Sequence, residues 1–230
     1  MALEIIEKSE DKNAWSTKKC IVVAIMSLIV GSAIFLLAYI CMNQNIGIGA
    51  INQPFLSFIV QHRRPIVTSI MKVISTITNP IPFAIIILAI ASIWAISKRE
   101  IWRPFLLSVA MGLAISASTT IKTFIMTARP AEIDMIAPYE LDYSFPSGHT
   151  LGIAVFILVL GYLIYSRHSS ALRIFDWFSM AIVGIGIVAA SRLYLGYHWL
   201  TDVTASIGIG FIILAILIFI DRIVVSRSEN

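Results

Sequence analysis

Charged residues are scarce in this sequence. Only 13% of the 230 residues are Asp, Glu, Lys or Arg, whereas 58% are hydrophobic and the mean hydropathy is +0.89. A soluble domain carries roughly 25% charged residues, so these few charges cannot cover the surface of a water-soluble globule this apolar. The scarcity excludes a cytosolic enzyme and a disordered chain, and it indicates an integral membrane protein.

Cysteine is almost absent as well, with only Cys20 and Cys41. On one helix these two residues would lie about 30 Å apart at 1.5 Å per residue, so they cannot pair, and a disulfide-stapled module is excluded. No cleavable signal peptide is evident, because residues 1–19 are polar and acidic. Basic runs interleaved with aromatic residues are also missing, so the net charge of +4 does not indicate a nucleic-acid partner.

Long apolar runs are what the sequence does contain. A spanning helix needs about 20 mostly apolar residues, and six runs approach or exceed that length. We therefore predict an all-α fold, a polytopic bundle of six transmembrane helices that forms a single membrane domain over residues 1–230. The runs are 20–42, 81–96, 104–126, 147–165, 175–190 and 201–220.

The distribution of basic residues predicts the orientation of the bundle. With six spans, one side of the membrane holds both termini and the second and fourth loops, and that side carries most of the 17 Lys and Arg residues. Cytoplasmic loops carry the excess of Lys and Arg. We therefore expect both termini in the cytoplasm, with residues 1–19 as a cytoplasmic segment, and the first, third and fifth loops outside.

The first external loop, residues 43–79, is long and partly apolar. Its apolar residues recur at near-helical spacing, interrupted by Pro65, which predicts one or two amphipathic helices. These helices would lie at the outer membrane interface or pack as a cap on the bundle, and the sequence leaves both alternatives open. The residues are Phe55, Phe58, Ile59, Ile66, Ile70 and Val73.

Three polar clusters lie at the predicted outer ends of the spans, where ionisable groups are costly and usually functional. The first contains Lys122 and Arg129, followed by Pro130, at the end of the third run. Seven residues make two helical turns, so both cations are expected on one helix face. They repel each other there unless an anion lies between or beside them; the alternative is that both side chains snorkel to the helix end.

The second cluster, Pro146-Ser147-Gly148-His149, opens the fourth run. Proline suits a helix start, Ser147 can cap it, and Gly148 lets a backbone N–H approach a ligand with no side chain in the way. A helix N-terminus with free N–H groups is an anion site. A simple capped helix start accounts for all of these residues except His149.

The third cluster, residues 191–202, links the last two runs and contains Ser191, Arg192, His198 and Asp202. His198 and Asp202 are four residues apart, so on a helix they are neighbours. A carboxylate beside an imidazole fixes its tautomer and raises its basicity, as in a catalytic triad. The alternative is a structural His–Asp hydrogen bond in a buried turn.

Together the clusters supply three cations, a helix N-terminus, two histidines and one carboxylate on the same side of the membrane. Arginine matches phosphate oxygens with two parallel hydrogen bonds. One histidine can act as a nucleophile and a second as a general acid. This inventory fits a phosphate group. No second carboxylate cluster offers a metal cage, so we expect no metal and no cofactor.

The combined pattern resembles the type 2 phosphatidic acid phosphatase family, whose relatives include bacterial lipid phosphatases, glucose-6-phosphatase and vanadium-dependent haloperoxidases. It reads Lys-x6-Arg-Pro, Pro-Ser-Gly-His and Ser-Arg-x5-His-x3-Asp, and it is complete over residues 122–202. The resemblance implies that His198 attacks phosphorus to form a phosphohistidine, that Asp202 holds His198, and that His149 protonates the leaving oxygen and then activates water. It also implies that the phosphate is held by Lys122, Arg129, Ser147, the Gly148 N–H and Arg192.

The resemblance implies an integral membrane lipid phosphatase with no metal requirement, acting at the outer side of a bacterial plasma membrane. The implied substrates are lipid phosphates such as phosphatidylglycerophosphate, undecaprenyl pyrophosphate and phosphatidic acid, in phospholipid or cell-wall metabolism. No nucleic acid and no obligatory protein partner is implied. The alternative is a proton-coupled membrane transporter that uses the same buried charges, although Lys122 alone lies within the apolar stretches that such a relay would need.

The third loop, residues 131–145, is also expected outside, and it carries four acids whose role the sequence leaves open. They either repel some anionic headgroups or solvate the loop, and the sequence favours solvation. The acids are Glu132, Asp134, Glu140 and Asp142.

Overall fold

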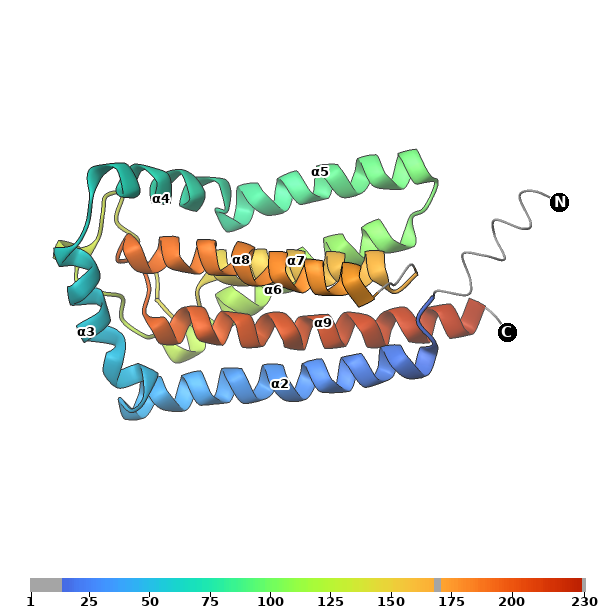
Figure 1. Cartoon of the computed structure of the whole chain (residues 1–230), viewed down its shortest axis with the longest axis horizontal. Helices are drawn as coiled ribbons and strands as arrows, with labels where there is room; N and C mark the ends of the chain where they lie inside the picture. The colour runs from blue at the N-terminus through green and yellow to red at the C-terminus, as the bar shows by residue number, and fades with distance from the viewer. Residues whose placement is uncertain (1–13, 168–170, 229–230) are drawn as a thin grey trace.

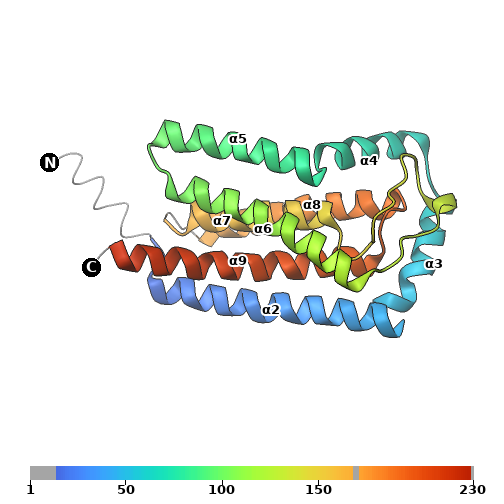
Figure 2. The ribbon, with the colours of Figure 1, turned by 180° about the vertical axis from the view of Figure 1, so that it is seen from behind.

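The computed structural model describes residues 14–167 and 171–228 of the chain. This part of the chain forms a bundle with six helices long and apolar enough to cross a membrane, arranged side by side (Figures 1 and 2). Each helix overlaps one predicted run, so the all-α prediction of six spans is confirmed. The helices are α2 (Thr17–Gln44), α5 (Pro80–Lys98), α6 (Trp102–Ile125), α7 (Gly148–Tyr165), α8 (Ala171–Tyr194) and α9 (Leu200–Ser228).

The helix ends follow from local residue chemistry. Ser16 caps α2 by accepting the backbone N–H of Lys19 at 3.3 Å, so the helix begins slightly before the predicted run. Pro80 begins α5, where its missing N–H has no partner to lose. Met126 ends α6 in a left-handed conformation, with φ at 52°. The chain that follows α6 therefore leaves the helix axis before it reaches Arg129.

The long first loop folds into two shorter helices, α3 (Ile48–Gln61) and α4 (Pro65–Ile77), and Pro65 begins the second. α4 packs against α8, and α3 packs against α8 and α9, so the loop caps the bundle. One apolar face of α4 nevertheless points away from the bundle, as membrane-interface helices do. At least half of the surface of each residue on this face is exposed: Ile66, Ile70, Val73 and Ile77.

The first and last spans pack closely along their length (Figure 1). A Cβ on Gly31 of α2 would lie 2.6 Å from the Gly208 carbonyl oxygen of α9, and a Cβ on Gly208 would lie 2.7 Å from the Gly31 oxygen. Small residues at such a crossing let two backbones approach, as is common in membrane bundles. Cys20 and Cys41 are both buried on α2 as free thiols, which confirms that they do not pair.

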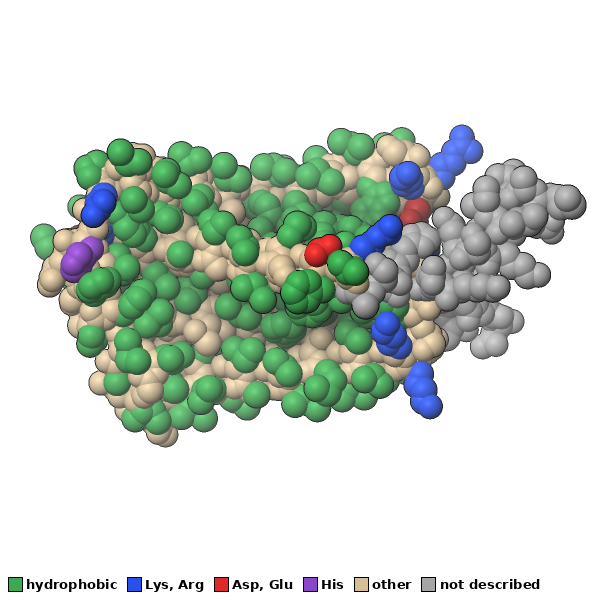
Figure 3. Space-filling model, in the orientation of Figure 1, with side chains coloured by type: hydrophobic (Ala, Val, Ile, Leu, Met, Phe, Trp, Pro, Cys, Tyr) green, Lys and Arg blue, Asp and Glu red, His purple; other side chains and the backbone are tan. Residues whose placement is uncertain are grey.

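The two ends of the bundle differ. The start of α2 and the end of α9 lie at one end, and α3 and α4 lie at the other (Figure 1). The surface between the ends is largely apolar, with the visible Lys and Arg side chains toward the ends (Figure 3). This is the surface that a bilayer requires. Residues 1–13 of the expected cytoplasmic segment lie outside the described residues.

Candidate active site

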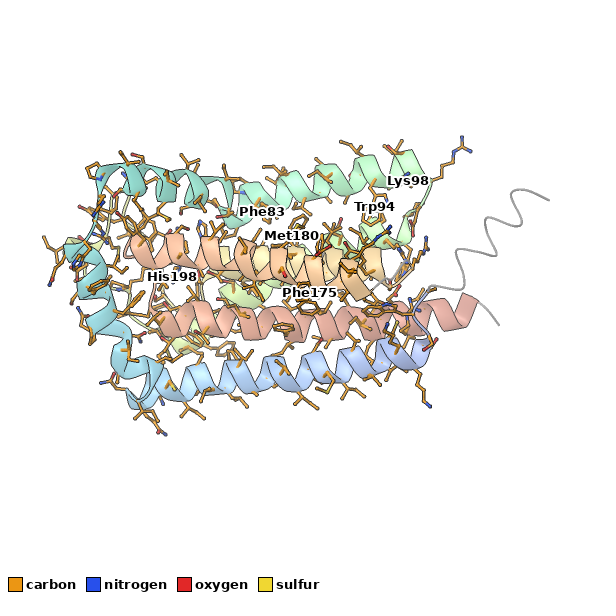
Figure 4. The ribbon with its side chains drawn as sticks, in the orientation of Figure 1. Phe83, Trp94, Lys98, Phe175, Met180 and His198 are labelled. Carbon is orange, nitrogen blue, oxygen red and sulfur yellow. The ribbon has the colours of Figure 1, made fainter. Side chains whose placement is uncertain are left out.

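The three predicted clusters meet at the end of the bundle that α3 and α4 cover. Figure 4 shows His198 there and Lys98 at the opposite end. α6, α7 and α9 contribute Lys122, His149 and Asp202, while His198 lies in the turn between α8 and α9. A cavity of about 310 Å³ opens among them, and its walls include Lys122, Gly148, His149 and His198.

His198 is held by Asp202, as predicted, with 3.1 Å between Nδ1 and Oδ2. Both residues are buried. The expectation that they share a helix is wrong, because α9 begins at Leu200 and His198 precedes it. The contact forms because Asp202 lies in the first turn of α9 and also accepts the Trp199 backbone N–H at 2.9 Å, a capping contact that fixes the carboxylate beside the turn.

Ser144 is a member of this group that no motif indicated. Its hydroxyl donates to Oδ2 of Asp202 and lies 3.4 Å from Nδ1 of His198, and the residue is fully buried. The Ser144 backbone N–H donates to the Thr127 carbonyl at 2.9 Å, which anchors the loop here. A serine just before Phe145-Pro146 has no pattern of its own, so only the fold could place it.

The surroundings of His198 favour a neutral imidazole. Burial is the main cause, and the charges of Arg129, Arg192 and Lys122 add to it, so the pKa of His198 lies well below its usual value of 6.5. With Nδ1 facing the carboxylate of Asp202, we assign the ring proton to Nδ1 from this contact. Nε2 then carries the lone pair and accepts a hydrogen bond from Nη1 of Arg129 at 3.3 Å.

The predicted cations Lys122, Arg129 and Arg192, here called the cation cluster, converge without sharing a helix face. Arg129 lies beyond the end of α6, because Met126 turns the chain and Pro130 disfavours helix at the residue before it. The expected single helix face is therefore wrong. Tyr197 joins two members of the cluster: its carbonyl accepts from Arg129 at 2.5 Å, and its ring lies 4.4 Å from the Arg192 guanidinium carbon.

Glu140 and Asp142 of the third loop, residues 131–145, pair with every member of the cation cluster. Asp142 lies 2.5 Å from Lys122 Nζ and 2.6 Å from Arg129 Nη2. Glu140 lies 2.8 Å from Arg129 Nη2 and also pairs with Arg192. An anion thus lies between Lys122 and Arg129, as their repulsion requires. Solvation, the interpretation that the sequence favoured, is therefore incomplete for these two acids, because both also pair with cations.

The ionisation of Asp142 follows from these contacts. Burial raises its pKa, but the hydrogen bond from Lys122 and the charge of Arg129 outweigh burial, and the pKa of Asp142 falls below its ordinary value of 3.8. Its side chain is still 61% exposed. The carboxylate is therefore charged at neutral pH and remains in contact with water.

Arg192 is the most enclosed member of the cation cluster, with a side chain only 1% exposed. Its Nη1 donates to Ser75 of α4, a contact that no motif in that loop indicated. Its Nε–H has no hydrogen-bond partner among the described residues. A buried donor left open costs free energy until an acceptor arrives, so this position favours an anionic ligand.

The start of α7 is a capped helix end, as its sequence indicates. The hydroxyl of Ser147 is fully buried and accepts the Thr150 N–H at 3.5 Å. Ser147 is not among the residues that line the cavity, so its contact with phosphate stays a prediction. Gly148 does line it, and a Cβ there would lie 3.2 Å from Ser118 Oγ and 3.3 Å from Pro80 Cγ.

His149 lies where two cavities adjoin. It lines the 310 Å³ cavity with His198 and a second one of about 210 Å³ with Ser75 and Tyr197. Its ring is therefore reachable from the cavity, as a proton donor to a bound group must be. Within residues 14–167 and 171–228, no three His, Cys, Asp or Glu side chains gather closely enough to hold a metal ion.

The turn that carries His198 is anchored by Arg63, a basic residue with no predicted role. Arg63 lies between α3 and α4 and donates to the carbonyls of Tyr194 at 3.0 Å and Asp134 at 2.6 Å. Gly196 has φ at +79°, and a Cβ there would lie 2.3 Å from the Asp134 oxygen and 2.9 Å from Arg63. Only glycine fits this close approach, which ties the first and third loops to the turn.

Fold and site together define a class of protein: a polytopic helical membrane protein with a buried histidine–carboxylate pair and a cation cluster at one end of its bundle. The family model of the PAP2 superfamily matches residues 103–223, just over half of the chain, and includes all three motifs. The chain belongs to the PAP2 superfamily, which confirms the resemblance seen in the motifs.

Two relatives from Bacillus subtilis are similar to this chain. Phosphatidylglycerophosphatase B of strain 168 is 28% identical over 121 residues, which are 50% of this chain and 56% of the relative. The chain thus matches little more than half the length of that protein. A crystal structure described as the first transmembrane PAP2 type phosphatidylglycerolphosphate phosphatase superposes with a TM-score of 0.72 at 22% identity, covering 84% of this chain and 96% of that one. That likeness shows a shared fold.

Proposed function

We propose that the protein is a membrane lipid phosphatase that removes the terminal phosphate of a lipid phosphate monoester or pyrophosphate. The observation that carries the proposal is the position of His198. Its Nδ1 is held by Asp202, and its Nε2 lies beside Arg129 on the wall of a cavity that His149 also lines. A neutral, oriented imidazole beside fixed cations is what nucleophilic attack on a phosphate needs.

In the first step, Nε2 of His198 attacks phosphorus and forms a P–N bond while the P–O bond to the lipid breaks. His149 gives its proton to the departing lipid oxygen, and the carboxylate of Asp202 stabilises the positive charge that develops on His198. The cation cluster neutralises the equatorial oxygens, which is the main task in phosphoryl transfer. The products of this step are the lipid alcohol, or lipid monophosphate, and a phosphohistidine.

In the second step, His149, now without its proton, takes one from water as the water oxygen attacks phosphorus. The P–N bond breaks, and inorganic phosphate leaves with His198 neutral again. Both steps use only side chains of this protein and one water, with His198 as nucleophile and then leaving group and His149 as general acid and then general base. The Gly148 N–H and Ser147 belong to the same proposal as donors to the phosphate.

Phosphatidylglycerophosphate is the first substrate to test, because the curated relative bears the name phosphatidylglycerophosphatase B. Undecaprenyl pyrophosphate and phosphatidic acid offer the same terminal phosphate on a different lipid. The cavity lies at helix ends, so a headgroup can reach it while the tails stay in hydrocarbon. The excess of basic residues at the other end supports a site on the outer side of the membrane.

A proton-coupled transporter has less support from the arrangement. A second buried carboxylate exists, Asp221, which accepts from Trp102 Nε1 at 2.8 Å and from Tyr162. It lies 19 residues from Asp202 along α9, about 29 Å at 1.5 Å per residue. Residues 203–220 between them contain no ionisable side chain. A proton relay along this helix would therefore have no ionisable group between Asp202 and Asp221 to pass the proton.

The test is phosphate release by the purified full-length protein in detergent with EDTA present, on the three lipid phosphates. We expect release from at least one of them, and we expect the His198→Ala variant to lose it. His62→Ala is the matched control, because His62 follows the last residue of α3 and its ring contacts Phe58 of that helix. Failure of the wild-type protein on all three lipids would refute the proposal, and full activity in His198→Ala would refute the nucleophile.

A further inference from the structure

Residues 139–143, here called the strap, belong to the loop between α6 and α7 and lie beside the cavity, which Glu140 and Asp142 line. Tyr139, Leu141 and Tyr143 point outward and are exposed, Leu141 to 87%. Glu140 and Asp142 point inward and pair with the cation cluster. The alternation therefore brings two carboxylates to the positions that a bound phosphate would occupy.

The strap already accepts the hydrogen bonds of the cation cluster that a bound phosphate would need. Arg129 gives Nε to the Asp142 backbone carbonyl at 2.7 Å and Nη2 to both carboxylates. Lys122 gives Nζ to Asp142, and Arg192 gives Nη2 to Glu140. A phosphate that enters this site competes with the two carboxylates for the same N–H groups.

Charge decides which ligand succeeds in that competition. The cation cluster carries three positive charges and the strap two negative ones, so the resting site has a net charge of +1. A phosphate dianion that displaces both carboxylates leaves +1 again. A phosphodiester monoanion that displaces both leaves +2 in a buried site. One that displaces a single carboxylate keeps +1 but gains only part of the cation cluster, because the other carboxylate keeps its own N–H partners. Unbalanced charge is costly at low dielectric.

We propose that Glu140 and Asp142 determine specificity: they fill the phosphate position in the resting protein and yield only to an anion that brings two negative charges to replace them. The inference rests on the proposed function and extends it to substrate choice. Terminal phosphates and pyrophosphates meet the requirement. The phosphodiester headgroups of ordinary phospholipids, which surround the protein in a bilayer, do not.

The burial of the two carboxylates fits this exchange. The side chain of Asp142 is 61% exposed and that of Glu140 is 27% exposed, so both can turn into water when displaced. The members of the cation cluster are 12% exposed or less and remain in place. The strap is thus the adjustable side of the site, and the cations are the fixed side.

The test measures binding of two soluble probes to the full-length protein in detergent at about pH 8, where a phosphate group carries close to two charges. The probes are inorganic phosphate and diethyl phosphate, a phosphodiester monoanion, and the method is isothermal titration calorimetry. The proteins are the wild type, Glu140→Gln/Asp142→Asn, and a control, Glu132→Gln/Asp134→Asn. The control removes the same two charges from the same loop at side chains that do not pair with the cation cluster.

We expect the wild type to bind phosphate and not diethyl phosphate. Glu140→Gln/Asp142→Asn should bind phosphate at least about ten-fold more tightly and gain measurable binding of diethyl phosphate. The control should match the wild type. Asp142→Asn alone is the second variant, because its exposed position keeps the fold intact, and it should shift both affinities in the same direction by a smaller factor.

Two results would overturn the inference: unchanged or weaker phosphate binding in both strap variants, or wild-type binding of diethyl phosphate as tight as that of phosphate. Either result would assign the acids to holding the cations in place. The proposed function is judged separately by lipid phosphate hydrolysis. If the wild-type protein binds phosphate but hydrolyses no lipid, the proposed function is refuted and the proposed role of the strap stands. If the wild type hydrolyses lipid but phosphate binding is unchanged in the strap variants, only the proposed role of the strap is refuted.

Discussion

At the scale of single residues, one carboxylate oxygen organises the proposed nucleophile. Oδ2 of Asp202 receives His198 Nδ1, the Ser144 hydroxyl and the Trp199 backbone N–H. Three donors on one oxygen fix the direction of the carboxylate. The orientation of His198 therefore depends on residues from the third loop as well as on its own turn.

Replacing Asp202 with Asn should lower kcat by on the order of 10²–10⁴, because an amide cannot hold the imidazole in the required tautomer. Ser144→Ala should lower kcat by about ten-fold, since it removes one hydrogen bond to a charged group. Steady-state kinetics and thermal unfolding of both variants check this. Wild-type rates in Asp202→Asn would remove Asp202 from the mechanism, and a Ser144→Ala variant that merely unfolds would make that serine structural.

The pKa of His198 predicts a pH profile. Burial and the nearby cations lower this pKa, so the ring loses its proton at a lower pH than a free histidine does. The nucleophile is thus unprotonated throughout the range where free histidine titrates. We expect the acid limb of kcat/KM to lie below pH 6.5, measured on the wild-type protein with a substrate whose own ionisation is known. An acid limb above 6.5 would contradict a neutral resting His198.

At the scale of secondary-structure elements, the position of His198 is set by segments far from it in sequence. Arg63, between α3 and α4, donates to the Tyr194 carbonyl at the turn between α8 and α9. It also donates to the Asp134 carbonyl of the third loop, so both loops are tied to the turn. Gly196 permits the approach. The cap formed by α3 and α4 is therefore part of the site and not only a covering.

Arg63→Ala should lower kcat by about ten-fold and reduce thermal stability, because two carbonyls lose a charged donor and the turn gains freedom. Arg64→Ala is the matched control: the neighbouring residue contacts Tyr194 and Thr68 only through its backbone. Kinetics and thermal unfolding of the two variants check the prediction. Equal behaviour of the two would show that the turn does not need this tie.

At the scale of the whole molecule, the bundle separates two buried polar groups by the length of a membrane span. His198, Asp202 and the cation cluster occupy one end, and Asp221 with Trp102, Tyr162 and Arg222 occupies the other. On the face that Figure 3 shows, the surface between these ends is largely apolar. The chemistry proposed here belongs to one side of the membrane only.

Reporter fusions test which side that is. A reporter fused after a residue within 133–140 should report an external location, and one fused within 99–101, at the opposite end of the bundle, should report the cytoplasm. The physical reason is the excess of Lys and Arg at the end that holds the start of α2 and the end of α9. A cytoplasmic signal from the first fusion would invert the proposed topology.

Much of the fold and part of the site follow from local signals in the sequence. Apolar runs predict the six spans, because a helix in hydrocarbon must satisfy its backbone internally and expose apolar side chains. The contact between His198 and Asp202 was predicted from their spacing, although the reason differs: a helix start, and not a shared helix, joins them. Arg129 was placed on α6 in error, because the left-handed Met126 leaves no strong mark in the sequence.

The sequence by itself therefore determined the membrane class, the six spans, the family and the motif residues, since each depends on hydropathy or on fixed spacing along the chain. Only the tertiary structure shows that Ser144 donates to Asp202, that Arg192 donates to Ser75 and that Arg63 donates to the turn between α8 and α9. It also turned Glu140 and Asp142 from loop acids into partners of the cation cluster. These contacts join residues separated by 11 to 131 positions, and no local pattern encodes which distant donor an isolated polar side chain will meet.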